Sequence, residues 1–301
     1  MKNKIITTNI SASVKDRLYS AANANNVDFN FLLRQYFQER FLFRLSKSMY
    51  VNNFILKGAL LFLAHDISRH RPTKDVDFLG TNINNDITEI EQIIKEIAAI
   101  DFPDGVVFAP DSIKTEIIKE HADYQGVRVR LKCSLGTVRS VIQLDIGFGD
   151  KLVCGPNKIE FPIILDFDPP VIQVYSIVSA IAEKFQAIVS LGLASSRMKD
   201  YSDILYFAST RSFKSEELSE AIKTTFNHRK TELENYKYIF NDEYKNNHDL
   251  NRMWKAFIAK HNMSTDIDFP DVINKIECFL LKCIDKHDQN MVWNYRSFIW
   301  E

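Results

Sequence analysis

Two aspartates separated by one residue are the feature of this sequence best suited to chemistry. Asp75 and Asp77 flank Val76, and Phe78 follows, so acidic and apolar residues alternate. In a β-strand, residues i and i+2 lie on the same face, which would give this strand one acidic and one apolar face. Two carboxylates on one face repel each other unless a cation lies between them, and Mg²⁺ is usually held by one or two carboxylates together with substrate phosphates. The spacing therefore indicates a divalent-metal site, whereas the triplet alone is also common in solvated loops.

A third carboxylate lies in a strongly apolar stretch. Asp145 stands in VIQLDIGF, residues 141–148. An acid in such a run is paired, bound to metal or placed at the end of a strand, and a surface position on an edge strand is an equal alternative. If this strand lies beside the one that carries Asp75 and Asp77, three carboxylates converge. That arrangement suits two-metal phosphoryl or nucleotidyl transfer.

Residues that could bind phosphate occur before and after these acids. Lys57-Gly58 follows an apolar run, and a glycine there would let backbone N–H groups approach a phosphate, although most such pairs are turns. Lys184 falls beside the apolar face of a predicted helix, where it either extends to solvent or binds a triphosphate. Asp200 and Asp203 are three residues apart on the next predicted helix, where local ion pairs on a charged surface are the simpler interpretation.

Composition restricts the classes of function. The chain has 301 residues, 46% of them hydrophobic, and its net charge of −1 means that any polyanion must be bound by local patches. One such patch is the first 50 residues, with 8 basic and 3 acidic side chains, which form either a solvated helix face or a basic shoulder for a phosphate backbone. No uninterrupted apolar run reaches the roughly 18 residues of a membrane span, and no signal core is present, so we expect a cytoplasmic protein.

Several common sites are disfavoured. The four cysteines include no CxxC pair, so we expect reduced, buried thiols rather than disulfides or a zinc site. The histidines form no HxH or HxxxH pair. Neither G-x-x-x-x-G-K-[ST] nor G-x-S-x-G occurs, which argues against a P-loop NTPase and an α/β-hydrolase.

Hydrophobic periodicity places the candidate residues on secondary structure. We expect helices at residues 14–24, 28–47, 86–100, 175–191 and 198–209, and strands at 74–80, 106–109, 114–118, 127–133 and 141–148. Ser13 is the expected N-cap of the first helix because Asp16 completes an S-x-x-D pattern. The break at Gly136 favours a hairpin. The Pro170 region and residues 210–215 are candidate boundaries, and from about 211 onward the sequence predicts a helical packing lobe.

The order of the motifs is more specific than any one of them. They read RFLFRLSKS from residue 40, FILKGAL from residue 54, RPTKDVDF from residue 71, LDI from residue 144, AEKFQA from residue 182 and RMKDYSD from residue 197. This order resembles the AbiEii/AbiGii toxin family, whose pattern runs roughly LKGG[TS]xL, R-x-[ST]-x-D-[IVL]-D-[FL], a lysine-bearing helix and [RK]-D-x-x-D. The resemblance covers about residues 10–210. One departure is Gly58-Ala59-Leu60 in place of Gly-Gly-Thr, and Ala59 would be strained if its φ had to be positive.

The resemblance implies a nucleotidyltransferase core like that of DNA polymerase β, dependence on Mg²⁺ or Mn²⁺, an NTP as substrate, and the toxin half of a toxin–antitoxin or abortive-infection system with a cognate antitoxin. By position in the motifs, Asp75 and Asp77 would bind metal, with Asp145 as a third ligand. Lys184 would hold the triphosphate, and Asp200 would be the acidic residue of the last motif. The nucleotide-binding set would be completed by Lys57, Gly58, Thr73 and Asp203.

The sequence thus predicts an α+β fold, with a mixed, mainly antiparallel sheet flanked by helices and a C-terminal helical lobe. The expected domains are a nucleotidyltransferase-like domain at 1–210 and a helical domain at 211–301. The expected reaction moves NMP from an NTP to an acceptor such as the 3′ end of tRNA, contacted by the first 50 residues and by Arg128, Arg130 and Lys132. The alternatives are an NTP-binding toxin with slow or no transfer, and a non-enzymatic interaction protein.

Overall fold

A computed structural model describes residues 9–65, 73–121, 124–261, 267–284 and 290–301. The chain divides into two compact units, the first comprising Met1–Gly149 and Pro156–Tyr175, and the second Asp150–Gly155 and Ser176–Glu301. The main division thus falls close to the candidate boundary at Pro170. The helices at 175–191 and 198–209, which the sequence placed with the first domain, belong to the second compact unit. The functional division at residue 210 stays a prediction.

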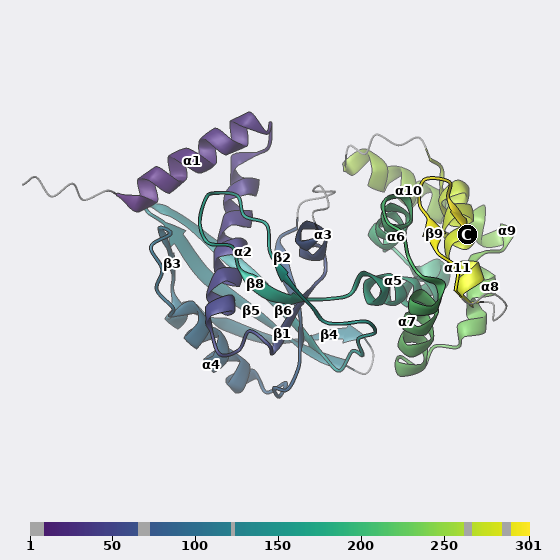
Figure 1. Ribbon diagram of the computed structural model, residues 1–301, viewed down its shortest axis with the longest axis horizontal. Helices are drawn as coiled ribbons and strands as arrows, with labels where there is room; N and C mark the ends of the chain where they lie inside the picture. Colours follow the sequence, from purple (N-terminus) through teal and green to yellow (C-terminus); the bar gives the residue numbers. More distant parts are fainter. Residues whose placement is uncertain (1–8, 66–72, 122–123, 262–266, 285–289) are drawn as a thin grey trace, which may run out of the picture. The chain divides into compact units, whose positions relative to one another are not determined.

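The first unit is built on an eight-stranded mixed sheet (Figure 1). Its elements are α1 (Ile10–Ala24), α2 (Phe29–Lys47), β1 (Phe54–Lys57), α3 (Leu60–Ala64), β2 (Asp75–Gly80), α4 (Ile87–Ala98), β3 (Val106–Phe108), the 3₁₀ turn η1 (Pro110–Ser112), β4 (Lys114–His121), β5 (Tyr124–Leu135), β6 (Val138–Phe148), β7 (Asn157–Glu160) and β8 (Val171–Val174). The strand order is β3-β5-β6-β2-β1-β8-β7, and β4 also pairs with β5. Among the strands of the described residues, only β2–β6 and β1–β8 are parallel, so the expected mainly antiparallel sheet is confirmed.

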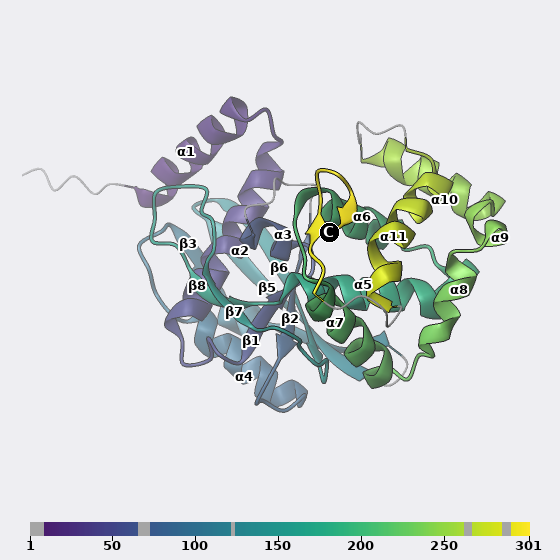
Figure 2. The same cartoon turned by 45° about the vertical axis from the view of Figure 1, so that its right-hand side comes forward.

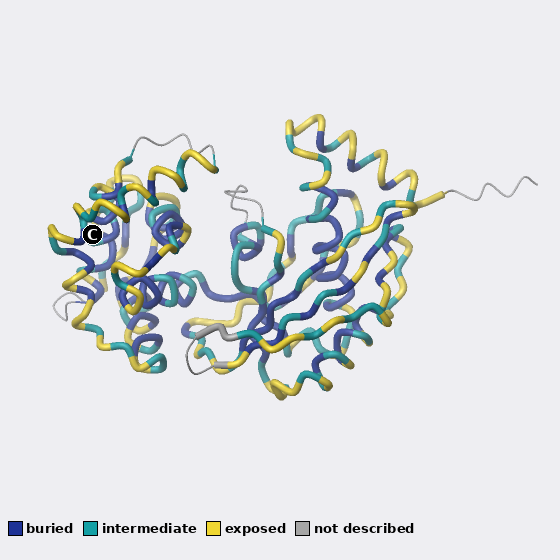
Figure 3. The backbone as a smooth tube through the Cα atoms, turned by 180° about the vertical axis from the view of Figure 1, so that it is seen from behind, coloured by how far each residue is buried: buried dark blue, intermediate teal, exposed yellow. Residues whose placement is uncertain are grey.

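Local sequence explains where the helices of this unit begin. Asp28 caps α2 by accepting from the Phe31 N–H, and Asp86 caps α4 by accepting from the N–H groups of the first turn. The expected start of the first helix was wrong: α1 begins at Ile10, capped by the side chain of Asn9 rather than by Ser13. Its apolar positions still recur at helical spacing, and Figure 3 shows buried and exposed positions alternating along α1.

The second unit is mainly helical. Its elements are α5 (Ile177–Leu191), η2 (Gly192–Ala194), α6 (Met198–Thr210), α7 (Ser215–His228), η3 (Leu233–Asn235), α8 (Tyr236–Ile239), α9 (Asp242–Lys245), α10 (His248–Lys260), α11 (Phe269–Ile284), β9 (Trp293–Asn294) and β10 (Ile299–Trp300). Helices α5, α6, α7 and α11 pack on one another (Figure 2). The short antiparallel pair β9–β10 was not predicted.

Buried aromatic side chains form the core of the second unit, as the sequence of its later part indicates. The ring of Phe279 stacks on Trp300, with centroids 6.0 Å apart, and lies 5.0 Å from Trp293. The indole N–H groups of Trp293, Trp300 and Trp254 donate to backbone carbonyls, at 2.7, 2.9 and 2.9 Å. Each buried tryptophan therefore has its polar atom satisfied, which stabilises this core.

One described stretch, Ile177–Ala194, is apolar and long enough to cross a membrane by length and composition alone. More than half of it, 56%, is buried within the protein. Such burial is typical of a core helix, and α5 packs against α6 and α7.

Candidate active site

The two aspartates of the DxD triplet lie on one face of β2, as predicted. Asp75 and Asp77 are half-buried, whereas Val76 and Phe78 on the opposite face are buried to 0% and 1% exposure. The strand is central in the sheet, between β6 and β1. Both carboxylates are therefore fixed on a rigid element, which is how a precise ligand pair is best held.

A row of charged residues crosses the sheet through Asp77. Its neighbour on β1 is Lys57, its neighbour on β6 is Asp145, and the row continues to Arg128 on β5 and Glu116 on β4. Residues directly opposite one another in a sheet share a face, and neighbouring strands lie about 4.8 Å apart. The two acid-bearing strands thus lie side by side, which was the condition for three carboxylates to converge. From Lys57 to Glu116 the charges of the row are positive, negative, negative, positive and negative.

Gly58 packs directly against the carboxylate of Asp77. Its φ is +69°, and a Cβ at this position would lie 1.8 Å from Asp77 Oδ2. The absence of a side chain therefore creates the space that the carboxylate fills. Ala59, where the family pattern has a second glycine, has φ −73° and ψ −26°. These are ordinary helical angles, so the departure introduces no backbone strain.

Asp145 is paired rather than surface-facing. Arg128 donates to it from Nε to Oδ1 and from Nη2 to Oδ2, both at 2.8 Å, and Gln143 Nε2 lies 3.4 Å from Oδ2. The Asp145 side chain is 10% exposed and β6 is an interior strand, so the edge-strand alternative is wrong. The hydrogen bonds to Asp145 raise the pKa of Arg128, with Asp75 and Glu116 adding to the effect.

The donor set fits a cation that is completed by substrate. Within the ranges that the structure describes, no group of three or more His, Cys, Asp or Glu side chains is arranged to hold a metal ion. Asp75 and Asp77 nevertheless present hard carboxylate oxygens on one face, which suits Mg²⁺ or Mn²⁺ held jointly with phosphates. Asp145 has both oxygens engaged by Arg128. The metal roles of the three acids stay predictions.

The other predicted phosphate-binding residues of the first unit lie close to the acids in sequence or register. Lys57 is half-buried directly opposite Asp77. Thr73, also half-buried, donates from Oγ1 to the backbone carbonyl of Asp75 at 3.2 Å, so its hydroxyl braces the start of β2. Arg71 and Pro72, which open this motif, lie outside the described residues.

The second unit brings Lys184 together with Asp200 and Asp203. Lys184 Nζ lies 3.1 Å from Asp200 Oδ1 and 2.8 Å from Asp203 Oδ2, and Arg197 Nε lies 2.5 Å from Asp200 Oδ2. Both carboxylates are almost fully buried, at 0% and 2% exposure. The expected local ion pair is present between Arg197 and Asp200, but the interpretation of these acids as a helix surface was wrong, because they form a buried ion cluster between α5 and α6.

Burial and ion pairing act against each other in this cluster. Burial alone would lower the pKa of Lys184, but Asp203 and Asp200 outweigh it, so the lysine pKa is raised and the side chain stays cationic. Burial would likewise raise the pKa of Asp200, yet Lys184, Arg197 and Lys199 hold it below its ordinary value. Lys184 and Asp200 are therefore both charged at neutral pH.

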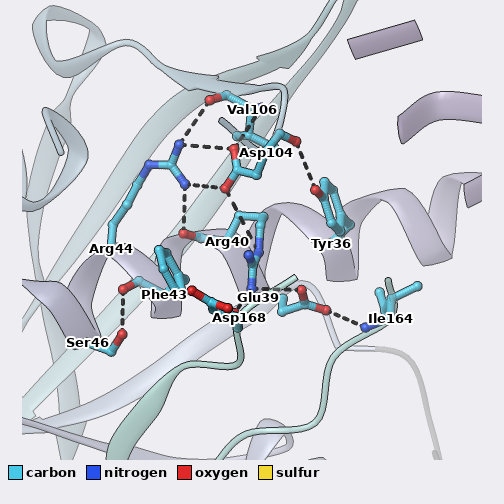
Figure 4. Close-up of polar contacts among 10 residues, drawn as sticks. All are labelled: Tyr36, Glu39, Arg40, Phe43, Arg44, Ser46, Asp104, Val106, Ile164 and Asp168. Carbon is cyan, nitrogen blue, oxygen red and sulfur yellow. Dashed lines mark hydrogen bonds and ion pairs between the residues drawn. The ribbon is translucent and has the colours of Figure 1, made fainter. Parts of the chain in front are cut away.

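Two central arginines of the first 50 residues, Arg40 and Arg44, do not contribute to a basic surface. Arg40 and Arg44 on α2 are 0% and 2% exposed. Arg44 donates from Nη1 and Nη2 to the two oxygens of Asp104, at 2.8 and 3.2 Å, and Arg40 Nη2 lies 3.1 Å from Glu39 Oε1 (Figure 4). Both interpretations of this segment, a solvated helix face and a basic shoulder, are therefore wrong at these two positions, since the arginines lie in the core and Arg44 pairs with a carboxylate 60 residues away.

Comparison with known proteins identifies the family. Residues 40–275 match the family described as "Nucleotidyl transferase AbiEii toxin, Type IV TA system", which is well over half of the chain. The chain belongs to the AbiEii family. The match begins later and ends later than the resemblance read from the motifs, so it includes α7 to α10 and the first part of α11. AbiEii membership makes the chain a toxin-type nucleotidyltransferase of a type IV toxin–antitoxin system, which implies a nucleotide substrate and an antitoxin partner.

Structural comparison gives two distant neighbours of this AbiEii chain. The crystal structure of JHP933 from Helicobacter pylori has 13% identity and a TM-score of 0.46, covering 85% of this chain and 93% of that one. A candidate nucleotidyltransferase from H. pylori has 12% identity and a TM-score of 0.46, covering 86% and 96%. No curated protein sequence is significantly similar to this chain.

Sequence analysis missed the partners that surround the AbiEii acids. Arg128 was considered only as an RNA contact, and Gln143 and Glu116 were not singled out. Pairing of Arg128 with Asp145 does follow from the hairpin, because Gly136 and Thr137 form its turn and each residue lies seven positions from the turn-flanking pair. The cysteines were also partly misjudged, since Cys154 and Cys278 are exposed.

Proposed function

We propose that this AbiEii chain transfers the nucleoside monophosphate of an NTP to an acceptor hydroxyl, with the 3′ end of tRNA as the acceptor. The acceptor oxygen attacks the α-phosphorus, the bond to the β-phosphate breaks, and pyrophosphate leaves. The observation that carries the proposal is the Asp75/Asp77 pair on one face of β2, seated against Gly58 and in register with Asp145. Family membership supplies the reaction class.

The acids of the first unit are suited to one task in this reaction. Asp75 and Asp77 would hold Mg²⁺ or Mn²⁺ against the phosphates, and the bound ion would supply charge neutralisation for the triphosphate and the leaving pyrophosphate. Thr73, bonded to the backbone of Asp75, keeps the acid pair in register. Lys57, opposite Asp77, provides a cation for the phosphates of the nucleotide. Gly58 has no side chain, so its backbone N–H group can approach a phosphate closely.

Lys184 is assigned to the triphosphate. Its ammonium carries three N–H donors, and Asp200 and Asp203 account for two of them. The two carboxylates fix the lysine and keep it charged, which is the state that a phosphate needs. In this assignment Asp200 and Asp203 act through the lysine.

The tRNA acceptor is supported by basic residues along β5. Arg130 and Lys132 follow Arg128 at alternate positions on the same face of the sheet, and both have exposed side chains. Arg40 and Arg44 no longer contribute, because they are buried. A protein that neutralises phosphates shows a linear fall of log affinity with log salt, so tRNA affinity is expected to be lower in Lys132→Ala with a shallower salt dependence.

The test is incubation with each α-labelled NTP, Mg²⁺ and total tRNA. Wild type is expected to label tRNA, and Asp77→Asn is expected to lose label by about 10²–10³-fold or more, the range for removal of one charge-stabilising group. Asp111→Asn, which removes an exposed carboxylate of the same unit, is the matched control and should label as wild type does. Absence of label with all four nucleotides, in protein that a nucleotide stabilises against heat, would favour a nucleotide-binding toxin without transfer. Absence of both would favour an interaction protein.

A further inference from the structure

Arg128 lies between two carboxylates of different character. It makes a two-point pair with buried Asp145, at 2.8 Å for each bond, and its Nη1 lies 3.7 Å from Glu116 Oε1 on β4. Glu116 is directly opposite Arg128 in the β4–β5 register and is 46% exposed. The arginine thus has one partner inside the acidic site and a second partner next to it.

Arg128 occupies one acceptor position on each oxygen of Asp145 and offsets the charge of that carboxylate, so Asp145 is a poorer metal ligand while the pair is intact. The pairing is nevertheless electrostatically sensible, because Asp145 lies beside Asp77 and a guanidinium offsets the repulsion between them. A divalent cation would offset the same repulsion and would itself repel the guanidinium. The arginine and the cation are therefore competitors for Asp145.

We infer that Arg128 is a positioning residue that exchanges partners. It holds Asp145 in the free enzyme, and moves onto Glu116 when a divalent cation and NTP enter, which frees Asp145 as the third acid of the site. This inference rests on the proposed function, because it uses that function's cation and nucleotide.

The structure makes this exchange a short movement. Arg128 has 29% of its side chain exposed, and its Nη1 is already only 3.7 Å from Glu116 Oε1. Glu116 also accepts from Arg130 Nη2 at 3.0 Å, and a carboxylate has about four acceptor positions, so it can receive both arginines. Exposed ion pairs contribute little to stability, so the loss or gain of the Glu116 contact changes the energy of the fold only slightly.

Metal binding without nucleotide gives the first test. Mn²⁺ affinity is measured calorimetrically for wild type, Arg128→Gln and Arg130→Gln. Removal of the competitor is expected to tighten Mn²⁺ binding by about tenfold or more in Arg128→Gln, which corresponds to about 1.4 kcal/mol. Arg130→Gln removes the same charge from the same face without touching Asp145, and is expected to change the affinity by less than threefold. The gain should vanish in the double variant Arg128→Gln/Asp145→Asn. Unchanged or weaker binding by Arg128→Gln would overturn the inference.

A second test uses wild type and so does not depend on a variant that folds poorly. The Nε–H of Arg128 donates to Asp145 Oδ1, and its NMR signal is assigned by its absence in Arg128→Gln. Mg²⁺ is added with the α,β-methylene analogues of ATP, GTP, CTP and UTP in turn. A shift of this signal on binding supports the exchange. Shifts elsewhere with the Arg128 signal unchanged overturn the exchange and leave the proposed function standing, whereas no shift with any analogue overturns both.

Discussion

Replacement of Gly58 by alanine tests how strictly the position of the Asp77 carboxylate governs activity. The new Cβ would lie 1.8 Å from Asp77 Oδ2, and real Cβ contacts essentially never fall under 3.0 Å. The carboxylate or the β1–α3 turn must therefore shift by more than about 1 Å, and a displacement of this size can reduce a catalysed rate by about 10²-fold.

The substitution also strains the backbone, and this contribution can be separated. Gly58 has φ +69°, and a side chain in such a conformation costs on the order of 1–3 kcal/mol. Gly136, in the β5–β6 turn of the same sheet, has φ +59°, but a Cβ there would meet only Ser11 Cβ at 3.4 Å, an ordinary contact. Gly136→Ala therefore shares the positive φ without the collision.

The assay is transfer of α-labelled nucleotide to tRNA, with the free energy of unfolding measured in urea for each variant. We expect Gly58→Ala and Gly136→Ala to be destabilised by comparable amounts, about 1–3 kcal/mol. Only Gly58→Ala should lose transfer, by about 10²-fold. Equal transfer by the two folded variants would refute the conclusion that Gly58 is needed to seat the Asp77 carboxylate.

Three further predictions concern the buried ion pairs. Lys184→Ala leaves Asp200 and Asp203 buried without their shared cation, so the free energy of unfolding should fall by about 3–5 kcal/mol; a fall under 1 kcal/mol in urea titrations would contradict the cluster. Because the folded-state pKa of Asp200 lies below its ordinary value, its contribution to stability is present above about pH 4 and lost as pH falls further. Asp200→Asn should therefore reduce the fall of the urea midpoint between pH 5 and pH 2. A fall as steep as that of wild type would contradict this contribution of Asp200. Arg44→Met should lower the free energy of unfolding by about 3–5 kcal/mol, because it leaves the fully buried Asp104 without its cation, whereas Arg44→Met/Asp104→Leu should recover most of the loss. The tRNA affinity of the folded variants should not change, and a reduced affinity would show that Arg44 does contribute to tRNA binding.

Short-range patterns in the sequence predicted much of the candidate site. The alternation of acids with Val76 and Phe78 predicted the two faces of β2, because successive side chains of a β-strand point to opposite faces of the sheet. The hairpin also predicts the pairing of Arg128 with Asp145, because each lies seven residues from the Leu135–Val138 pair that flanks the Gly136-Thr137 turn. The resemblance of motif order to the AbiEii family was confirmed by the family match.

Long-range pairing explains what could not be predicted. The arginines of α2 recur at spacing typical of a solvated face, yet Asp104, 60 residues after Arg44, lies in the core and draws Arg44 inside. Nothing local to Asp200 or Asp203 reveals that Lys184 of another helix neutralises them. A charge pattern gives the position of charges on an element, whereas burial depends on partners that only the fold brings together.

The most direct test of the proposed function is the stoichiometry of its two products. With Mg²⁺, tRNA and the preferred α-labelled NTP, wild type is expected to release one pyrophosphate for each label incorporated. Asp77→Asn, in folded protein that still binds tRNA, should lose both signals together by about 10²-fold or more. Incorporation by Asp77→Asn at the wild-type rate would contradict the assignment of the acid pair on β2 as the centre of the reaction.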